Sequence, residues 1–240
     1  MKAIILAAGM GKRLGGDLPK VMQTVGGLPL LRHVLNALDF ISENDVTLVV
    51  GYKKEDVFAA FPDCAYAVQE QQLGTGHAAL MAEPILNDYD GSVLVCYGDM
   101  PLFARETYTA LAELHASQGN ACTMLSGVKD IPFGYGRITR GADNSFSAIV
   151  EEKDCTETQR AITEINAGVY IFDARTLFSV LKSLTNNNAQ NEYYLTDAPE
   201  IIAKNGGRVG VLKRELGDEL LGVSTQEDLA AIDALLRSRA

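Results

Sequence analysis

Positive charge is scarce in this sequence of 240 residues, because 21 Lys and Arg stand against 31 Asp and Glu, a formal net charge of −10. That balance argues against a nucleic-acid-binding protein, which needs a basic face. Cysteine is also sparse, and the four thiols form no C-x-x-C pair, which is typical of reduced cysteines in an intracellular protein. No apolar run approaches a membrane span, and no signal peptide is evident. We therefore expect a cytoplasmic chain without nucleic-acid or membrane partners.

Apolar residues make up 47% of the chain, enough for a core without disulfide support. Short apolar runs alternate with helical patterns through about residue 128. The predicted strands cover residues 3–7, 46–50, 66–68, 92–97 and 121–126. The predicted helices begin at Pro29 or cover residues 55–61, 77–86 and 105–116. This alternation predicts a Rossmann-like, doubly wound, mostly parallel α/β sheet.

The pattern changes in the second half of the chain. Residues 134–152 are rich in Gly, Asp and Ser, and later elements are expected at residues 165–172, 209–212 and 224–240. We interpret this half as a β-rich substrate lobe inserted on the sheet. The predicted organisation is one domain, residues 1–240, with a nucleotide-binding part over about 1–128 and the lobe with closing elements over about 129–240.

The first predicted strand runs into a loop with two glycines, L-A-A-G-M-G-K-R-L, at residues 6–14. Glycines let backbone N–H groups approach a phosphate closely. Lys12, Arg13 and Lys20 form the local basic cluster that an acidic protein needs if its ligands are polyphosphates. An ordinary strand–helix turn with exposed basic residues is the alternative.

Two common phosphate-binding motifs do not fit this loop. A dinucleotide fingerprint needs a third glycine where Leu14 stands. A P-loop needs glycine at the position of Leu6 and Ser or Thr at the position of Arg13. The loop is therefore a phosphate-binding candidate of another kind.

Asp99 ends the strong predicted strand S-V-L-V-C-Y-G-D. In open α/β sheets the carboxyl ends of the strands face the ligand crevice. A carboxylate there suits Mg²⁺, which binds one or two carboxylates together with water and substrate oxygens. A turn or helix-capping aspartate is the alternative, since Pro101 follows closely.

Further motifs follow in a fixed order along the chain. They are D-L-P-K-V (17–21), Q-L-G-T-G-H-A (72–78), Y-G-D-M-P-L (97–102), G-Y-G-R-I (134–138), V-E-E-K-D (150–154), E-I-N-A-G (164–168) and N-N-N-A-Q-N-E-Y-Y-L-T-D (186–197). Together with the first loop, this set resembles the sugar-nucleotide pyrophosphorylases. Within them it is most similar to the uridylyltransferase domain of the bifunctional N-acetylglucosamine-1-phosphate uridyltransferases.

The resemblance implies a fold of the nucleotide-diphospho-sugar transferase type and a Mg²⁺-dependent reaction. UTP and N-acetylglucosamine 1-phosphate would give UDP-N-acetylglucosamine and pyrophosphate. The implied catalytic residues are Arg13, Lys20 and Asp99, with Asp99 also the metal ligand. The implied nucleotide-binding residues are Leu6, Ala7, Ala8, Gly9, Gly11, Gln69, Gln72, Gly74 and Thr75. The implied sugar-binding residues are Tyr97, Gly98, Gly136, Glu151 and Asn166.

The resemblance also implies individual roles. Lys20 would contact the α-phosphate and Arg13 the departing phosphates. Gln69 and the backbone at Gly74 would read the uracil edge, whereas His77 is interpreted as structural. Without the resemblance, each glutamine is an ordinary solvated loop residue, and Glu151 belongs to a surface charge run.

The chain departs from the family pattern at Lys12, where Thr or Ser is usual, at Ala167, where Thr is usual, and at Ser224, where Asn supplies a metal-binding oxygen. Ser224 begins S-T-Q-E, a capping-box pattern, so we expect it to cap the last helix and regard it as a doubtful metal ligand. We likewise expect Asp197 to cap a helix. The family's hexapeptide β-helix is absent from the sequence, so acetyl transfer is not expected.

Two alternatives remain open at this point. A close relative of the implied enzyme would use another sugar 1-phosphate or another base, such as CTP. A protein of a different class would bind a nucleotide sugar without turnover and act as a regulatory subunit, for which Ser224 is the main support. The sequence does not indicate a homo-oligomer.

Overall fold

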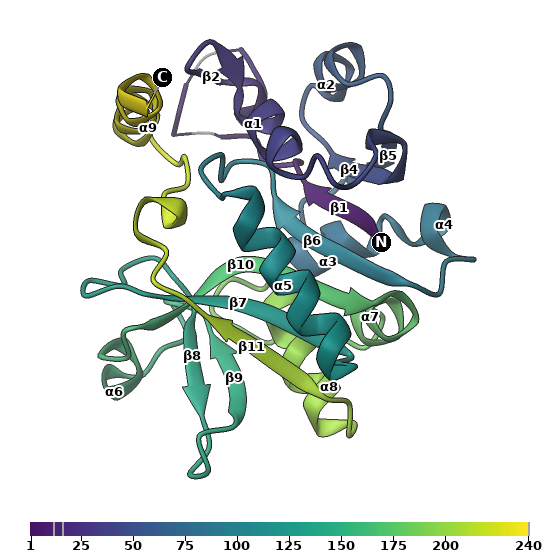
Figure 1. Ribbon diagram of the computed structural model, residues 1–240, viewed down its shortest axis with the longest axis vertical. Coiled ribbons are helices and arrows are strands. Elements are labelled where there is room, and N and C mark those ends of the chain that lie inside the picture. Colours follow the sequence, from purple (N-terminus) through teal and green to yellow (C-terminus); the bar gives the residue numbers. More distant parts are fainter. Residues whose placement is uncertain (12, 16, 240) are drawn as a thin grey trace.

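The structure, a computed structural model, describes residues 1–11, 13–15 and 17–239. One twisted sheet runs through the molecule, with helices on both of its faces (Figure 1). Its strands, in the order β11-β7-β10-β6-β1-β4-β5, are β11 (Val209–Lys213), β7 (Cys122–Val128), β10 (Glu164–Asp173), β6 (Ser92–Tyr97), β1 (Lys2–Leu6), β4 (Val46–Val50) and β5 (Ala65–Val68). The strand order turns at β1, which lies between β4 and β6, as in a doubly wound sheet.

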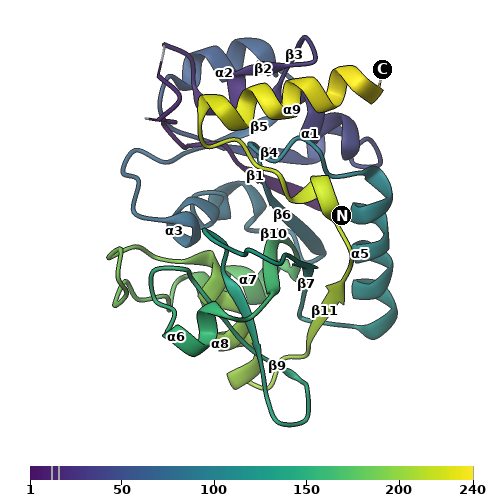
Figure 2. The ribbon, with the colours of Figure 1, turned by 90° about the vertical axis from the view of Figure 1, so that its left-hand side faces the viewer.

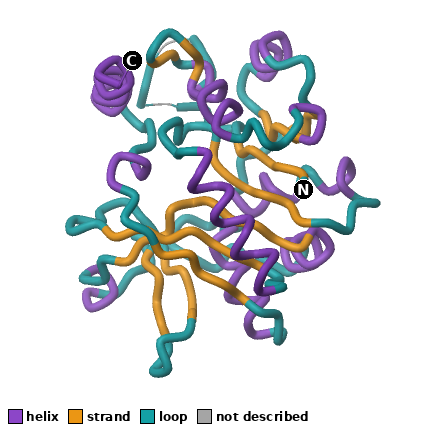
Figure 3. The backbone as a smooth tube through the Cα atoms, viewed as in Figure 1, coloured by secondary structure: helices purple, strands orange, loops and turns teal. Residues whose placement is uncertain are grey.

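Four of the six strand pairs along this order are parallel. β1 is parallel to β4 and β6, β4 to β5, and β7 to β11. β10 is the exception, because it is antiparallel to both of its neighbours, β6 and β7. A hairpin of β8 (Arg137–Arg140) and β9 (Phe146–Val150) is joined to β10 and projects from the sheet (Figure 3). The mostly parallel α/β fold is thus confirmed, and the β-rich second half shares the main sheet.

The two faces of the sheet bury two separate apolar layers. Along β1, Ala3 and Ile5 pack into one layer and Ile4 and Leu6 into the other, as the alternation of a strand requires. The first layer contains α1 (Leu30–Ala37), α2 (Lys54–Ala60) and α5 (Arg105–Gln118). The second contains α3 (Thr75–Leu80), α4 (Glu83–Leu86), α7 (Ala174–Leu181) and α8 (Ala198–Lys204).

The C-terminal helix α9 (Gln226–Arg239) lies beside the N-terminal part of the chain (Figure 2). It packs against the small hairpin of β2 (Thr24–Val25) and β3 (Leu28–Pro29). The N–H of Gly26 donates to Asp233 Oδ1 at 2.7 Å, and the Gln226 amide donates to the carbonyl of Leu14. A third apolar cluster, which includes Leu14 and Ile232, fills the space between them. Helix α9 therefore contacts the first loop through Leu14.

The structure corrects several sequence-based boundaries. The predicted helix 77–86 is two helices, α3 and α4, because Pro84 has no N–H to continue the hydrogen-bond ladder. Helices α6 (Glu157–Arg160) and α7 were not predicted. The remaining short elements are the 3-10 turns Lys20–Met22, Glu43–Asp45, Leu195–Asp197 and Gly217–Leu220. All four cysteines are buried and free. None of the helices in the described ranges is long and apolar enough to cross a membrane.

Candidate functional site

A cavity of about 310 Å³ opens at the carboxyl ends of β1 and β6, where the strand order turns. This is where open α/β sheets place their ligand crevice. The predicted residues that line it are Leu6, Ala7, Ala8, Gly9, Lys20, Gln69, Gln72, Gly74, Thr75, Tyr97 and Asp99. Val21, Ala78 and Glu192 line it as well and were not predicted. Residues from five separate motifs thus meet at one opening.

Lys20, which follows the first loop, brings a positive charge to Asp99. The ammonium group of Lys20 pairs with Asp99 Oδ2, and these side chains are 17% and 24% exposed. Gly11 has φ +62°, and a Cβ there would lie 3.0 Å from the Cβ of Lys20. A side chain at this position would press against the lysine stem, so glycine is needed both for the backbone conformation and for the path of Lys20.

The first loop itself contains two further basic residues, Arg13 and Lys12. Arg13 is exposed and, among the described residues, does not line the cavity. The prediction that involves Lys12 lies outside the described residues. Lys20 is therefore the cation that the described structure brings to the cavity floor.

Gln69 and Gln72 reach the cavity from the loop after β5. Gln69 is only 4% exposed, and its Nε2 donates to the carbonyl of Gly74 at 3.1 Å and to His77 Nδ1 at 3.0 Å. Burial lowers the pKa of His77, which keeps the ring neutral and lets Nδ1 accept. Gln72 is exposed and donates from Nε2 to the carbonyl of Ala8 at 2.6 Å, which ties this loop to the first one.

The Asn-rich segment 186–195 closes against the same loop. Tyr193 donates its N–H to the carbonyl of Leu73 at 2.8 Å, and its carbonyl accepts from the N–H of Gly76 at 2.8 Å. Gly74 has φ +117°, and a Cβ there would lie 2.5 Å from the carbonyl oxygen of Tyr193. This close approach brings Glu192 to the cavity. Only the match of the whole 186–197 motif hinted at such a role, since nothing in the residue pattern connects it to residue 74.

The predicted sugar-binding residues Gly136, Glu151 and Asn166 form a row across β10, β8 and the end of β9. In the registers of these strands, Arg137 lies opposite both Val150 and Ile165, so the residues one step further are neighbours. The N–H of Asn166 donates to the carbonyl of Gly136 at 2.9 Å. A Cβ on Gly136 would lie 3.6 Å from either carboxylate oxygen of Glu151. The row therefore sets a carboxylate and an amide beside a residue that has no side chain.

Hydrogen bonds fix the polar groups of this row. Glu151 Oε1 accepts from the hydroxyl of Thr196 at 2.8 Å, while burial raises the pKa of Glu151. Asn166 donates from Nδ2 to the hydroxyl of Tyr170 at 2.6 Å and accepts at Oδ1 from the N–H of Gly168 at 3.1 Å. Both side chains are thus oriented before any ligand arrives.

Tyr97 connects the cavity with the row. Its ring lines the cavity and packs on Gly168, whose Cβ, if present, would lie 2.6 Å from the ring. Burial raises the pKa of the Tyr97 phenol, against the opposing effect of the nearby Thr75 side chain. Gly98, the next residue, is buried against Val21 and does not line the cavity in the described structure.

The chemistry at Asp99 fits a magnesium ion bound through one carboxylate. The carboxylate is partly exposed and lines the cavity, and Mg²⁺ takes most of its other ligands from water and substrate phosphates. No cluster of three or more His, Cys, Asp or Glu suited to a metal occurs among the residues that the structure describes. The protein thus offers this ion a partial site that substrate oxygens would complete.

The segment that contains Ser224 lies beside Asp99, since the preceding residue Val223 donates its N–H to the backbone carbonyl of Asp99 at 3.0 Å. The prediction that Ser224 caps the last helix is wrong. Thr225 is the capping residue: its Oγ1 accepts from the N–H of Asp228 at 3.2 Å, and Asp228 Oδ2 accepts from the N–H groups of Thr225 and Ser224 at 2.9 Å and 2.8 Å. The Ser224 hydroxyl makes no hydrogen bond within the described residues.

The second predicted cap is also wrong. Asp197 stands at the N-terminal end of α8, but its side chain accepts no capping hydrogen bond. The backbone at Asp197 is already helical, whereas a capping residue normally has an extended conformation that brings its side chain back to the helix. Asp197 instead lines a second cavity of about 220 Å³ together with Glu151, Asp154 and Glu200.

The fold and the cavity together define a nucleotidyltransferase-type α/β domain. A UDP-glucose pyrophosphorylase complexed with UDP-glucose superposes with a TM-score of 0.75 over 100% of this chain and 99% of that one, at 18% identity. A structure from Bacillus anthracis, described as a glucose-1-phosphate thymidylyltransferase, superposes with a TM-score of 0.76 at 21% identity over 98% of this chain and 95% of that one. At these identities the likeness concerns the fold alone.

Residues 3–192 match the MobA-like NTP transferase domain, and the chain belongs to that family. It is 44% identical over 240 residues, all of this chain, to the bifunctional protein GlmU of Acetivibrio thermocellus. It is 44% and 43% identical over 238 residues, 99% of this chain, to the bifunctional proteins GlmU of Streptococcus suis and Geobacillus thermodenitrificans. The chain spans about half of these relatives, 52% of each.

Proposed function

We propose that this chain transfers a uridylyl group from UTP to N-acetylglucosamine 1-phosphate, with Mg²⁺, in the cytoplasm. A phosphate oxygen of the sugar 1-phosphate forms a new bond to the α-phosphorus of UTP. The bond from that phosphorus to the bridging oxygen of the β-phosphate breaks, and pyrophosphate leaves with the electron pair. The observation that carries the proposal is the cavity at the ends of β1 and β6, lined by residues of the first loop, by Gln69 and Gln72 of the loop after β5, and by Asp99.

The roles of the two halves follow from this placement. Residues 1–128 supply most of the cavity and would bind the nucleotide, whereas the row of Gly136, Glu151 and Asn166 would bind the sugar. Tyr97 stands between the two and would lie beside the phosphates. The likeness to GlmU proteins along the whole chain supports the pairing of uridine with N-acetylglucosamine.

The attacking phosphate is already anionic at neutral pH, so the reaction needs no general base. The protein must instead overcome the repulsion between two anions and hold them in line, and such positioning can supply up to about 7–11 kcal/mol of the barrier. Lys20 is the cation at the cavity floor, and its ammonium would move from Asp99 to the α-phosphate as the substrates bind. Arg13, on the exposed side of the loop, would contact the departing phosphates.

Asp99 would hold the magnesium ion, with substrate oxygens and water completing the shell. The ion would neutralise the negative charge that develops on the departing pyrophosphate. Before the substrates and the ion bind, the Lys20 ammonium balances the charge of this carboxylate.

The orientation of Gln69 favours uracil over cytosine. Its Nε2 is committed to Gly74 and His77, which leaves Oε1, an acceptor, for the base. Uracil presents an N3–H donor to such an acceptor, whereas cytosine presents an acceptor at N3 and would be repelled. Base choice would thus depend on which end of one buried amide faces the cavity.

The test is release of pyrophosphate by the purified chain with Mg²⁺, UTP or CTP, and a panel of sugar 1-phosphates. We expect the highest kcat/KM with UTP and N-acetylglucosamine 1-phosphate, and a loss of about 10²–10³-fold in kcat in Lys20→Gln. Lys54→Gln is the matched control, because Lys54 pairs with Glu70 at 3.0 Å on the outer surface and should keep full activity. No turnover with any sugar 1-phosphate, or full turnover in Lys20→Gln, would overturn the proposal.

The same preparation separates a non-catalytic sugar-nucleotide receptor from an enzyme. A receptor binds UDP-N-acetylglucosamine tightly by calorimetry, releases no pyrophosphate, and binds equally well in Asp99→Ala. An enzyme shows turnover that falls in Asp99→Ala. A preference for another sugar or base within the panel would keep the reaction class and replace the named substrates.

A further inference from the structure

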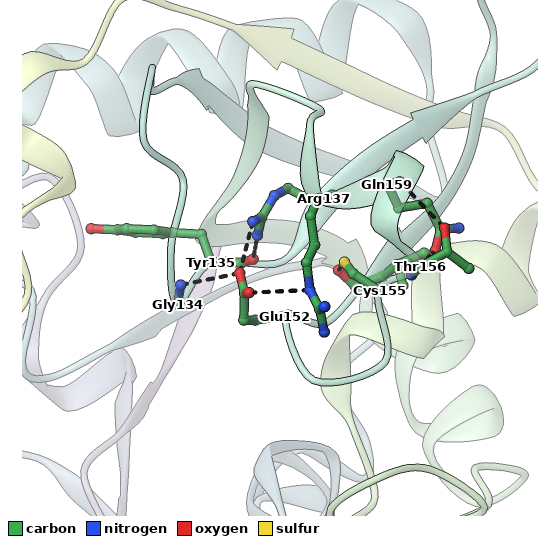
Figure 4. A network of polar contacts seen from close by, with 9 residues as sticks. Gly134, Tyr135, Arg137, Glu152, Cys155, Thr156 and Gln159 are labelled. Carbon is green, nitrogen blue, oxygen red and sulfur yellow. Dashed lines mark hydrogen bonds and ion pairs between the residues drawn. The ribbon is translucent and has the colours of Figure 1, made fainter.

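We propose that Arg137 and Glu152 are positioning residues for the sugar 1-phosphate, an inference that rests on the proposed function. They form an ion pair of 2.7 Å (Figure 4). The register of β8 and β9 places this pair beside the row of Gly136, Glu151 and Asn166. Each partner is the chain neighbour of a row residue, since Arg137 follows Gly136 and Glu152 follows Glu151.

The pair ties two chain segments together at this point. Arg137 donates to Glu152 Oε2 from one terminal nitrogen and to the carbonyl of Tyr135 from the other. The N–H of Gly134 donates to the same carboxylate at 3.2 Å. The loop before Gly136 and the turn after Glu151 are therefore joined by the Arg137 guanidinium and the Glu152 carboxylate, whose other oxygen also pairs with Arg160 at 3.7 Å.

The unfavourable free energy of burying a charged arginine indicates that this ion pair does more than fill space. Arg137 is only 2% exposed, and its Nε is a buried donor without a partner among the described residues. A buried ion pair contributes less to stability than a well-packed apolar replacement in many proteins. What the pair does provide is a fixed direction for the segments on each side of the row, where a small displacement strongly affects a bound ligand.

The turn after Glu151 is anchored at its other end as well. Asp154 Oδ1 accepts from the N–H of Ala189, and so joins the turn to the Asn-rich segment. Burial opposes ionisation of Glu152, but hydrogen bonds from Arg137 and Gly134 outweigh it and hold its pKa below the ordinary value. Glu152 therefore stays charged at neutral pH, and Glu151 lies between two fixed points.

The structure also offers a matched control pair. Arg140 and Glu164 form an ion pair of 2.6 Å at the other end of β8, with side chains 25% and 10% exposed. Ser126 and Lys213 also contact Glu164, so this pair stabilises the same part of the fold. In the part of the chain that the structure describes, no hydrogen bond or ion pair joins it to the three row residues, so removing it should change stability without changing the sugar site.

The experiment compares Glu152→Gln and the double variant Arg137→Met/Glu152→Gln with the control Arg140→Met/Glu164→Gln. We measure KM for N-acetylglucosamine 1-phosphate, KM for UTP, kcat and Tm. The first two variants should raise KM for the sugar phosphate about tenfold while KM for UTP stays within twofold. The control should change Tm and leave both KM values unchanged.

The outcomes separate the two proposals. If the wild-type chain turns over but both variants at 137 and 152 keep the wild-type KM for the sugar phosphate, the positioning role is overturned and the proposed function stands. Equal rises in both KM values, or the same rise in the control, would also overturn it. If the double variant does not fold, Glu152→Gln decides, since its amide keeps the size of the side chain but removes the charge of the ion pair. Absence of turnover in the wild type overturns both.

Discussion

Asp197 is held in an environment that disfavours its charge, and this makes a prediction about stability. Burial, followed by the negative charges of Glu200, Glu151 and Asp154, raises its pKa from 3.8 to about 6, against the opposing effect of Lys204. Asp197→Asn removes the charge and keeps the shape. We expect this substitution to stabilise the folded protein at neutral pH.

The direction follows from proton binding. Between pH 3.8 and about 6 the folded chain keeps the Asp197 proton that the unfolded chain has lost. The free energy of unfolding therefore falls as pH rises through this window, and the whole penalty is present above it. A pKa shift of this size corresponds to at most about 3 kcal/mol, and we take about 1–2 kcal/mol because solvent partly screens the half-buried carboxyl.

The assay is thermal unfolding of wild type and Asp197→Asn at pH 4 and pH 8. For a chain of this length, 1–2 kcal/mol corresponds to a rise in Tm of about 3–6 °C. We expect that rise at pH 8 and almost none at pH 4. Asp143→Asn is the control, because hydrogen bonds from Ser145 lower the pKa of this exposed carboxyl, so the neutral form should bring no gain at pH 8. An Asp197→Asn protein that is no more stable at pH 8, or equally stabilised at pH 4, would refute the reasoning.

Three further predictions concern the cavity. Gly74→Ala should lower the free energy of unfolding by about 2–4 kcal/mol in urea titrations, since φ at this residue is +117° and the new Cβ would lie 2.5 Å from a backbone oxygen. The control is Gly119→Ala, at φ +60° in open space, which should lower the free energy of unfolding by only about 1 kcal/mol. Ser224→Asn should bind Mn²⁺ several-fold more tightly by calorimetry with UTP present. Thr225→Ala should lower the free energy of unfolding by about 1 kcal/mol and leave metal binding unchanged. Equal metal affinity in wild type and Ser224→Asn would contradict a position of residue 224 near the ion. His77→Leu should narrow the preference for UTP over CTP about tenfold, because the glutamine amide loses the acceptor that fixes it, and an unchanged ratio would show that the ring does not orient the amide.

The sequence was most informative where local chemistry is specific. Short apolar runs and helical apolar patterns placed the strands and helices of the first half, and the bounds of β4 and β6 agree with the prediction. The glycines and basic residues of the first loop and the carboxylate at the end of β6 indicated one ligand site, and the structure brings Gly9, Lys20 and Asp99 to one cavity. These features depend on residues close together in the chain or on a general rule of parallel sheets.

The sequence was least informative where a feature depends on strand direction or on cap geometry. β10 is buried along nearly its whole length, and such a run has the same pattern whether its neighbours are parallel or antiparallel. The last helix is capped by Thr225, although Ser224 fits the capping pattern one residue earlier. Which of two adjacent hydroxyl residues caps a helix depends on backbone angles that composition does not fix.

By itself, then, the amino-acid sequence determined the sheet class, the glycine-containing loop after the first strand and the family, because each is encoded in short runs of residues whose spacing is set by covalent geometry. The tertiary structure alone decided that Glu192 reaches the cavity at the ends of β1 and β6, that Gly136, Glu151 and Asn166 form one row, and that Arg137 pairs with Glu152 beside it. Those contacts join segments 15 to more than 100 residues apart, and strand register and buried charge pairing set them only once the whole chain has folded.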